Sequence, residues 1–416
     1  MSKQSISNPI FLLPLLLASC AEGGLPPAPI SHQGMDNIRA RACQQTLNVT
    51  ENDGEIPDNA VLRMVTGSIY DPTLRAGTLH PWHGLPYLPT MHDLLNMPND
   101  SDLFPVADSF SYEILVGGQH FAGPFQVTVD VVPYLFVDAN HGDDANGGGS
   151  PNAPLKSLTR AIEVASPRCT IKVNPGVYDL ENGEQFPLVI DFPMTIHGDP
   201  ANRGGADLEP GEGLVTRISG GGIHHLNEYG EDLRVSVVMR GEGAVLNGVD
   251  IGIGAEELES LEDASVALLM MGSGHRLLNS TSSHNLVGVM SVLSSSTLVE
   301  NCRIFGGLVG AFGIDPLGRN RIRNCEITGN LTGIQLEDVN AFDLGTPLDL
   351  GLNTIIENYL GVEVFGELVA PQDAVGNTWN SMPLTTLDRD GDVDGFVHDV
   401  LLDQINMIDS RAGVGR

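Results

Sequence analysis

The residues best suited to chemistry lie near the C-terminus, where carboxylates recur at every second position. Four aspartates alternate with other residues in a glycine-containing segment: Asp388, Asp390, Asp392 and Asp394. In a turn, this spacing lets alternate side-chain oxygens converge on a hard cation, and Ca²⁺ prefers oxygen ligands. Asp399 follows as a further candidate ligand. We therefore predict a calcium site over residues 388–399, with a solvated acidic loop as the alternative.

The aspartate segment resembles the calcium loops of EF-hand and dockerin-like proteins, although neither register completes their pattern. An EF-hand loop needs glycine at its sixth position and a ligand at its twelfth. Counted from Asp390, the twelfth residue is Leu401, which has no ligand atom. Counted from Asp388, the twelfth residue is Asp399, but Val393 replaces the glycine. The pattern favours calcium without a complete EF-hand.

Lysine usage restricts the polysaccharide chemistry that the chain could perform. Elimination from a uronate needs a base for a carbon-bound proton and a cation that neutralises the carboxylate. Lysine occurs only at Lys3, Lys156 and Lys172, so a lysine base later in the chain is excluded. Three arginines could serve instead, although no spacing singles them out: Arg276, Arg319 and Arg321.

The sequence gives little support for a hydrolytic mechanism. The Gly-His-Gly and Arg-x-Lys tripeptides of polygalacturonases do not occur in the sequence. Cleavage by a pair of carboxylates stays open, although an abundance of acidic residues is not evidence for it. His224 and His225 could bind a metal or act in catalysis, but the glycines before them favour an exposed turn.

The composition excludes two broad classes of protein. The chain has 416 residues, with Asp+Glu 53 against Lys+Arg 21 and a net charge of -32. A phosphate backbone would be repelled by this charge, which excludes a nucleic-acid partner. The only long apolar run is N-terminal, which excludes a multi-span membrane protein. The hydrophobic fraction of 41% and the length predict a chain of several globular domains.

Residues 1–19 have the features of a cleavable export signal, with an apolar run too short to span a bilayer. The tetrapeptide Leu17-Ala18-Ser19-Cys20 resembles the lipobox of bacterial lipoproteins, whose cysteine becomes the lipidated N-terminus. This resemblance implies lipidation of Cys20 and a place in the cell envelope, at the outer membrane or cell surface. The alternative is an ordinary signal peptide. Residues 20–43, rich in proline and glycine, are expected to form a tether.

Residues 44–133 are expected to form a β-sandwich. Residues 110–114 and 125–131 alternate apolar and polar side chains, as strands with one buried face require. The segments 47–53, 108–112 and 127–129 resemble cadherin-like, Ig-type repeats of bacterial surface proteins. That resemblance implies a spacer or an adhesive module, and a spacer without a ligand is our preferred interpretation.

An internal repeat occupies the second half of the chain. Four segments share a turn residue followed by two residues and a Gly-aliphatic pair, and they begin at residues 285, 307, 330 and 358. The offsets between them are therefore 22, 23 and 28 residues. This period is typical of one coil of a parallel β-helix, with three short strands and three turns.

Two segments within the repeat predict how neighbouring coils stack. Residues 299–304 match residues 322–327 with a constant offset of 23. Strands of adjacent coils lie ~4.8 Å apart, so matched residues stack directly. We expect four residues to form structural stacks, a buried pair of thiols and an amide ladder at a bend: Cys302 on Cys325 and Asn301 on Asn324. Together with Cys43 and Cys169, these cysteines are too few for a disulfide scaffold.

The same offset places opposite charges together outside the coil. Glu300 would face Arg323, and Arg303 would face Glu326. The preferred interpretation is two exposed ion pairs, each contributing about 0 to 1 kcal/mol. The functional alternative is a catalytic acid with an arginine.

Residues 134–200 are expected to cap the β-helix and form its first coils, with an amphipathic helix over 155–165. The run contains five characteristic motifs: Val137-Asp138, Gly142-Asp143-Asp144-Ala145-Asn146-Gly147, Pro154-Leu155-Lys156-Ser157-Leu158, Pro175-Gly176-Val177-Tyr178 and Phe186-Pro187-Leu188. With these motifs the run resembles the family catalogued as domain of unknown function 1565, which implies a right-handed parallel β-helix of the pectate-lyase type.

The predicted fold class is therefore all-β. A right-handed, single-stranded parallel β-helix spans residues 201–380, with an N-terminal capping helix and a small β-sandwich before it. Trp379 is expected to seal the last coil. The acidic segment 381–416 follows, and residues 396–408 are compatible with a helix.

The preferred function is that of an exported surface lipoprotein whose β-helix binds carbohydrate or extracellular matrix without catalysis. The alternative is a calcium-dependent lyase or glycosidase that acts on an acidic polysaccharide. Several charged side chains gathered across adjacent coils would favour the enzyme, and a face of Asn, Ser and aliphatic residues would favour binding.

Overall fold

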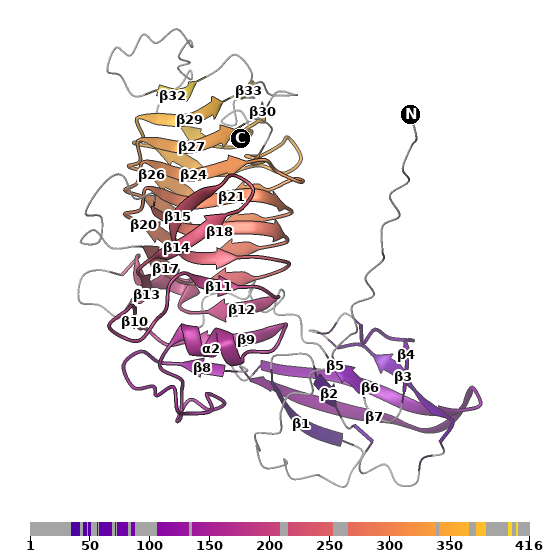
Figure 1. Ribbon diagram of the computed structural model, residues 1–416. Coiled ribbons are helices and arrows are strands. Elements are labelled where there is room, and N and C mark those ends of the chain that lie inside the picture. The colour runs from indigo at the N-terminus through magenta and orange to yellow at the C-terminus, as the bar shows by residue number, and fades with distance from the viewer. Residues whose placement is uncertain are drawn as a thin grey trace, which may run out of the picture.

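The computed structural model consists mainly of strands in two groups, β1 to β7 and a stack that runs from β8 to β32 (Figure 1). No helix in the part of the chain that the structure describes is long and apolar enough to cross a membrane. The described residues are 35–41, 45–47, 49–50, 56, 58–68, 71, 73–81, 85–87, 106–132, 135–208, 215–252, 265–337, 341–365, 372–379, 398–401 and 405–406.

The first group is a small β-sandwich, as predicted. Its five-stranded sheet has the order β1 (Met35–Arg41), β7 (Gln119–Val132), β6 (Val106–Val116), β3 (Ala60–Thr66) and β4 (Leu79–Pro81). Its two-stranded sheet pairs β2 (Gln45–Leu47) with β5 (Leu85–Tyr87). Leu85 and Tyr87 pack into the same buried cluster as Leu62 and Phe110 of the larger sheet. The resemblance to cadherin-like repeats stays a prediction.

Strand β1 corrects the extent of the predicted tether. The tether was expected over residues 20–43, but Met35–Arg41 pairs in parallel with β7 from Gln126 to Val132. The physical reason is the long edge of β7. Because β6 occupies only one side of that strand, the other side offers unpaired backbone groups to any nearby segment.

The second group is a parallel β-helix built of three sheets. Sheet I contains β10 (Gly176–Tyr178), β13 (Thr216–Ser219), β17 (Asp250–Gly252), β20 (Thr281–Ser283), β23 (Arg303–Phe305), β26 (Glu326–Thr328), β28 (Thr354–Ile356) and β31 (Thr378–Trp379). Sheet II contains β11 (Leu188–Ile190), β15 (Glu231–Met239), β18 (Ser265–Ser273), β21 (Val287–Ser295), β24 (Val309–Ile314), β27 (Thr332–Glu337), β29 (Leu360–Phe365) and β32 (His398–Leu401). Sheet III contains β8 (Leu135–Val137), β9 (Cys169–Val173), β12 (Met194–His197), β16 (Val245–Asn247), β19 (Arg276–Leu278), β22 (Leu298–Glu300) and β25 (Arg321–Arg323).

The strand register confirms the predicted repeat. Val287 is paired with Val309, Val309 with Thr332, and Thr332 with Leu360, so the four predicted segments begin successive strands of sheet II. In the central coils the chain runs from sheet III to sheet I to sheet II before it returns. The predicted fold class is therefore confirmed.

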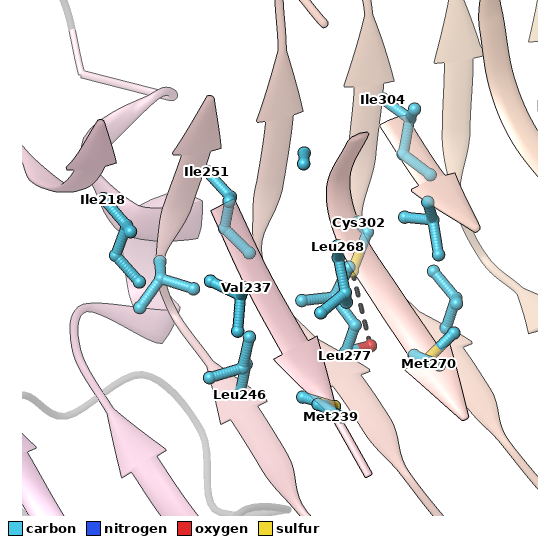
Figure 2. Close-up of a cluster of buried hydrophobic side chains, with 14 of the residues drawn as sticks. Ile218, Val237, Met239, Leu246, Ile251, Leu268, Met270, Leu277, Cys302 and Ile304 are labelled. Carbon is cyan, nitrogen blue, oxygen red and sulfur yellow. Dashed lines mark hydrogen bonds between the residues drawn. The ribbon is translucent and has the colours of Figure 1, made fainter. Parts of the chain in front are cut away.

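The interior of the β-helix is filled by aliphatic side chains from all three sheets. Figure 2 shows Ile218, Ile251 and Ile304 of sheet I together with Val237 and Leu268 of sheet II, and all five are buried. Alternation along each short strand sends one side chain inward and its neighbours outward. The inward rows supply the core, which leaves the outward rows available for function.

An amide ladder runs along one bend of the stack, as predicted for Asn301 and Asn324. The Nδ2 of Asn324 donates to the Oδ1 of Asn301 at 3.4 Å, and the Nδ2 of Asn301 donates to Asn279 at 2.6 Å. Asn279 donates in turn to Asn247, and the Nδ2 of Asn247 lies 3.1 Å from the Nδ1 of His197. Asn279, Asn301 and Asn324 have φ of 44°, 54° and 51°, a left-handed conformation that Asn tolerates well.

The predicted cysteine stack is confirmed. Cys302 and Cys325 are buried with free thiols, and the amide of Cys302 donates to the Sγ of Cys325 at 3.5 Å. The row continues through Asn353 and Asn377, whose side-chain oxygens accept the amides of Cys325 and Asn353. Burial raises the pKa of the Cys302 thiol, so it acts here as a small apolar residue. Cys169 is also buried and free.

The cap contains the helix α2 (Leu158–Val164), which is shorter than the predicted 155–165. Ser157 ends the preceding extended segment and accepts the amide of Arg160, so it is the N-cap residue. Leu155 lies outside the helix because it bridges Val137 of β8. Leu158 and Ala161 are buried against the first coils, as the amphipathic pattern predicted.

The cap motifs hold this helix and its entry loop in place. Glu184 accepts the amides of Leu158 and Thr159 at 2.7 and 2.8 Å and the Thr159 hydroxyl at 2.6 Å. Asp144 accepts the amide and hydroxyl of Ser157 at 2.9 and 2.7 Å. These carboxylates satisfy helix N-terminal donors that would otherwise lack partners.

A β-hairpin covers part of the outer face of sheet II. It is formed by β14 (Gly222–Leu226) and the start of β15, and in Figure 1 it crosses the front of the stack near β18 and β21. Leu226 packs there with Val266, Leu269 and Met290 in a buried cluster. The Tyr229 hydroxyl at the tip of the hairpin donates to Asp315.

The last coils confirm one prediction and correct another. Trp379 is buried in the main core cluster beside Ile355, as expected for a residue that seals the coil. The helix considered for residues 396–408 is wrong where the backbone is described. Strand β32 pairs in parallel with β29, and β33 (Ile405–Asn406) pairs in parallel with β30 (Gln372–Asp373). The free edge of β29 favours strand pairing over a helix.

Candidate functional site

The outer face of sheet I carries charged side chains that come from adjacent coils. Six neighbouring strands of this sheet, from β13 to β28, each contribute one residue to an outward row, which we call the charged row. Its members are paired in register from one coil to the next: Arg217, Asp250, Thr281, Arg303, Glu326 and Thr354. The row exists because the isoleucines beside these residues point inward.

Two arginines share one carboxylate at the centre of the charged row. The Nε of Arg303 lies 3.6 Å from one oxygen of Glu326, and the Nη1 of Arg203 lies 3.5 Å from the other. The Arg303–Glu326 pair was predicted from the offset of 23 and is confirmed. All three side chains are partly exposed, so a ligand can reach them.

Arg203 reaches the charged row from a loop. It belongs to the turn η1 (Pro200–Gly205), and its carbonyl accepts the Thr281 hydroxyl at 3.0 Å. Gly204 allows the loop to lie against the sheet, because a Cβ there would come 2.4 Å from the Asp250 nitrogen. Sequence reasoning missed Arg203, since nothing in its neighbourhood connects it to Glu326, 123 residues away. The glycine pair after Arg203 is the one signal of close packing.

An aromatic side chain orients the central arginine. The guanidinium carbon of Arg303 lies 4.8 Å from the ring centroid of Phe305, two residues further along β23. The His284 ring meets Phe305 edge-on, with a centroid distance of 5.5 Å. This cation–π contact helps to hold the Arg303 guanidinium in its position on the sheet, with the Nε buried.

Asp250 forms a second, more buried part of the charged row. It lies 3.5 Å from Arg217 and accepts the Ser283 hydroxyl at 3.2 Å. Burial raises its pKa, and the nearby Arg217 opposes that rise. Asp250 and Glu326 are three strands apart, or ~14 Å at the usual strand spacing, which exceeds the separation of a glycosidase carboxylate pair. The row therefore offers hydrogen bonds to a ligand more readily than paired acid–base chemistry.

The predicted exterior pair of Glu300 and Arg323 is wrong. The two residues are opposite each other in the register, but Arg323 is only 6% exposed and binds other partners. Its guanidinium contacts Asp343 at 2.8 Å and Asp349 at 2.9 Å, and Arg319 also binds Asp343. The loop after β27 thus folds over β25 and captures Arg323, which the local repeat could not reveal. Arg319 is a structural ion-pair partner here.

The remaining sequence candidates lie apart from the charged row. Arg276 and Arg321 are partly buried on sheet III. His224 and His225 lie on strand β14, not in the predicted exposed turn, and the Nδ1 of His225 is 2.7 Å from Asp232. The turn prediction failed because the hairpin pairs the residues after the glycines with β15.

The predicted calcium and lipid sites are not tested by the structure. Asp388, Asp390, Asp392, Asp394, Cys20 and Cys43 lie outside the described residues, and Asp399 is described only as backbone of β32. Among the residues that are described, no group of three or more His, Cys, Asp or Glu side chains could hold a metal ion. The calcium site stays a prediction.

The fold and its capping motifs define a parallel β-helix protein with an N-terminal helical cap. The family model described as protein of unknown function (DUF1565) matches residues 140–386, and the chain belongs to this family. No curated protein matches the sequence. The motifs that suggested the family supply the Asp144 and Ser157 contacts of the cap.

Several solved structures are similar at low sequence identity. A pectate lyase, Pel9A, shares 14% identity and has a TM-score of 0.42, with 66% of this chain and 78% of that chain covered. The pectin methylesterase PemA from Erwinia chrysanthemi shares 13% identity at a TM-score of 0.32, covering 57% and 67% of the two chains. A rhamnogalacturonan lyase shares 13% identity at a TM-score of 0.33, covering 59% and 67%.

Proposed function

We propose that this chain is an exported surface lipoprotein that binds carbohydrate on the outer face of sheet I and does not cleave it. The observation that carries the proposal is the Arg203–Glu326–Arg303 constellation, where a loop and two adjacent strands bring exposed donors and acceptors together. Sugar hydroxyls are recognised by such groups, because hydrogen bonds to charged partners are stronger than those between neutral groups.

The charged row is open to a ligand at its Arg303–Glu326 end, because Asp250 and Thr281 in its middle are only 5% and 0% exposed. From Arg217 to Glu326 the row crosses five strands, a span of ~19 Å at the usual strand spacing. The wide spacing of Asp250 and Glu326 favours binding over hydrolysis by this row.

The rest of the proposal rests on sequence. Lipidation of Cys20 would anchor the chain to the cell envelope, at the outer membrane or cell surface, through acyl chains alone. Residues 388–399 would bind calcium and could make retention of a glycan calcium-dependent. Neither part is needed for the charged row to bind a ligand, so the row can be tested by itself.

Substitution of Arg303 by alanine should weaken carbohydrate binding about tenfold, because a charged donor and the partner of Glu326 are lost together. Affinity electrophoresis of the chain from residue 21 onward, through gels that contain single polysaccharides, measures this effect. The matched control is Arg240→Ala, which removes a more exposed arginine, 46% against 34% for Arg303, that is paired with Asp191. Equal retardation of wild type and Arg303→Ala would contradict the proposal.

The same polysaccharides should remain intact. Incubation with uronate polymers, with and without calcium, is followed by the absorbance of unsaturated products and by release of reducing ends. Either product would favour the alternative, a calcium-dependent lyase or glycosidase that acts on an acidic polysaccharide.

A further inference from the structure

The arginines on the outer face of sheet I are each compensated by a carboxylate. Arg217 lies 3.5 Å from Asp250, Arg303 lies 3.6 Å from Glu326, and Arg203 lies 3.5 Å from Asp207 as well as from Glu326. The face therefore has no surplus of positive charge, although it has many charged hydrogen-bonding groups.

The rest of the chain adds a repulsive field for anions. Its net charge is -32, and like charges act over about 8 Å at physiological ionic strength. A polyanion that approached the charged row would meet this field and would also compete with Glu326 for both arginines. A neutral ligand meets neither obstacle.

The paired charges remain free to bond hydroxyl groups. The contacts of Arg203 and Arg303 with Glu326, at 3.5 and 3.6 Å, are longer than an ordinary N–H···O hydrogen bond. The Nε of Arg303 is buried and makes no hydrogen bond within the described residues, although the side chain as a whole is 34% exposed. A hydroxyl placed between these groups could accept from a guanidinium and donate to the carboxylate at once.

Apolar surface borders the same coils. Leu308 and Leu331 lie in the turns that lead from sheet I to sheet II, on neighbouring coils, and are 44% and 52% exposed. Each follows its charged-row strand by three residues. Large exposed side chains at repeated positions suit the C–H faces of sugar rings, which are apolar.

We propose that the occupant of this face is a neutral oligosaccharide, whose hydroxyls bond the Arg203–Glu326–Arg303 group and whose C–H faces rest on Leu308 and Leu331. The inference rests on the proposed function and adds the class of sugar. It excludes uronate and sulfated polymers as the preferred ligands.

Substitution of Glu326 by glutamine distinguishes the two classes by the sign of its effect. For a neutral ligand, Glu326→Gln removes a charged acceptor and loosens both arginines, so binding should weaken about tenfold. For an anionic ligand, the same change removes a competing carboxylate, so binding should strengthen. Glu163→Gln, which removes an exposed charge on α2, is the matched control. Far-UV circular dichroism checks that the variants keep the β-helix.

Affinity electrophoresis is carried out with neutral polymers (mixed-linkage glucan, xylan, galactomannan) and with acidic polymers (polygalacturonate, alginate, chondroitin sulfate). The inference is supported if a neutral polymer retards the wild type and Glu326→Gln weakens that retardation. The retardation of the wild type should also change less than about twofold between about 0.05 M and about 0.5 M NaCl. Retardation by acidic polymers alone, or a stronger interaction in Glu326→Gln, overturns it while the proposed function stands. Retardation by no polymer overturns both.

Discussion

Substitution of Glu184 by alanine should lower the free energy of unfolding by about 3 to 5 kcal/mol, because several buried donors lose their acceptor together. Glu184 is 3% exposed and accepts two backbone amides and one hydroxyl from the first turn of α2. Alanine would leave these groups without a partner inside the protein. The helix covers the first coils of the β-helix, so its loss would also expose the core.

The Glu184 effect can be separated from a general effect of removing charge. Glu163→Ala, on the exposed side of the same helix, should change stability by less than about 0.5 kcal/mol, since an exposed ion pair contributes little. Urea denaturation followed by far-UV circular dichroism measures both variants. If Glu184→Ala were as stable as Glu163→Ala, the cap would not depend on this carboxylate.

Acid should destabilise the protein through His197, which begins the amide ladder. Burial, together with the charge of Lys172, lowers the pKa of His197 to about 3. An unfolded histidine has a pKa near 6.5, so between these values the unfolded state binds a proton that the folded state does not. Stability therefore falls as pH drops from about 6.5 towards 3, by about 5 kcal/mol in total from this residue.

The His197→Asn variant isolates this contribution from that of the many carboxylates. Asparagine can still contact Asn247 but does not titrate. The unfolding free energy of the variant should therefore fall less steeply than that of the wild type between pH 6 and pH 4, and the two slopes should differ by about 1.4 kcal/mol per pH unit. Urea denaturation at several pH values gives the two slopes. A difference in unfolding free energy between the two proteins at neutral pH does not affect the test, because only the slopes with pH are compared. Parallel slopes would show that His197 titrates normally in the folded protein.

The sequence predicts the β-helix well because stacking imposes a local rule. Each coil repeats its interior residue types, so the offset of 23 alone predicts that Cys302 contacts Cys325 and that Asn301 contacts Asn324. The same rule predicts the Arg303–Glu326 pair. Where neighbouring coils decide the contact, sequence reasoning is sufficient.

The rule fails wherever a loop leaves the coil. Arg323 was expected outside, beside Glu300, but the loop that contains Asp343 and Asp349 folds back and buries it. Arg203 was missed because its loop crosses several coils before it reaches Glu326. Loop paths depend on tertiary packing that has no periodicity in sequence, so Arg203, one of the three residues of the candidate site, could not be predicted.

Strand pairing at the edges was also hard to predict. The sequence of β1 looks like part of a tether, and its place in the sheet follows from the free edge of β7. The backbone of β32 extends sheet II for a similar reason, although its sequence is compatible with a helix. In both places an unpaired edge outweighs local preference.

The most direct test of the central claim is to locate the bound carbohydrate. Hydrogen–deuterium exchange is measured with and without neutral oligosaccharides of glucose, xylose and mannose, and the Arg303→Ala variant serves as the control. We expect protection in peptides that contain β20, β23, β26 and the Arg203 loop, and no such protection in the variant. Protection confined to the β-sandwich or to the outer face of sheet II, or protection that persists in Arg303→Ala, would contradict the account.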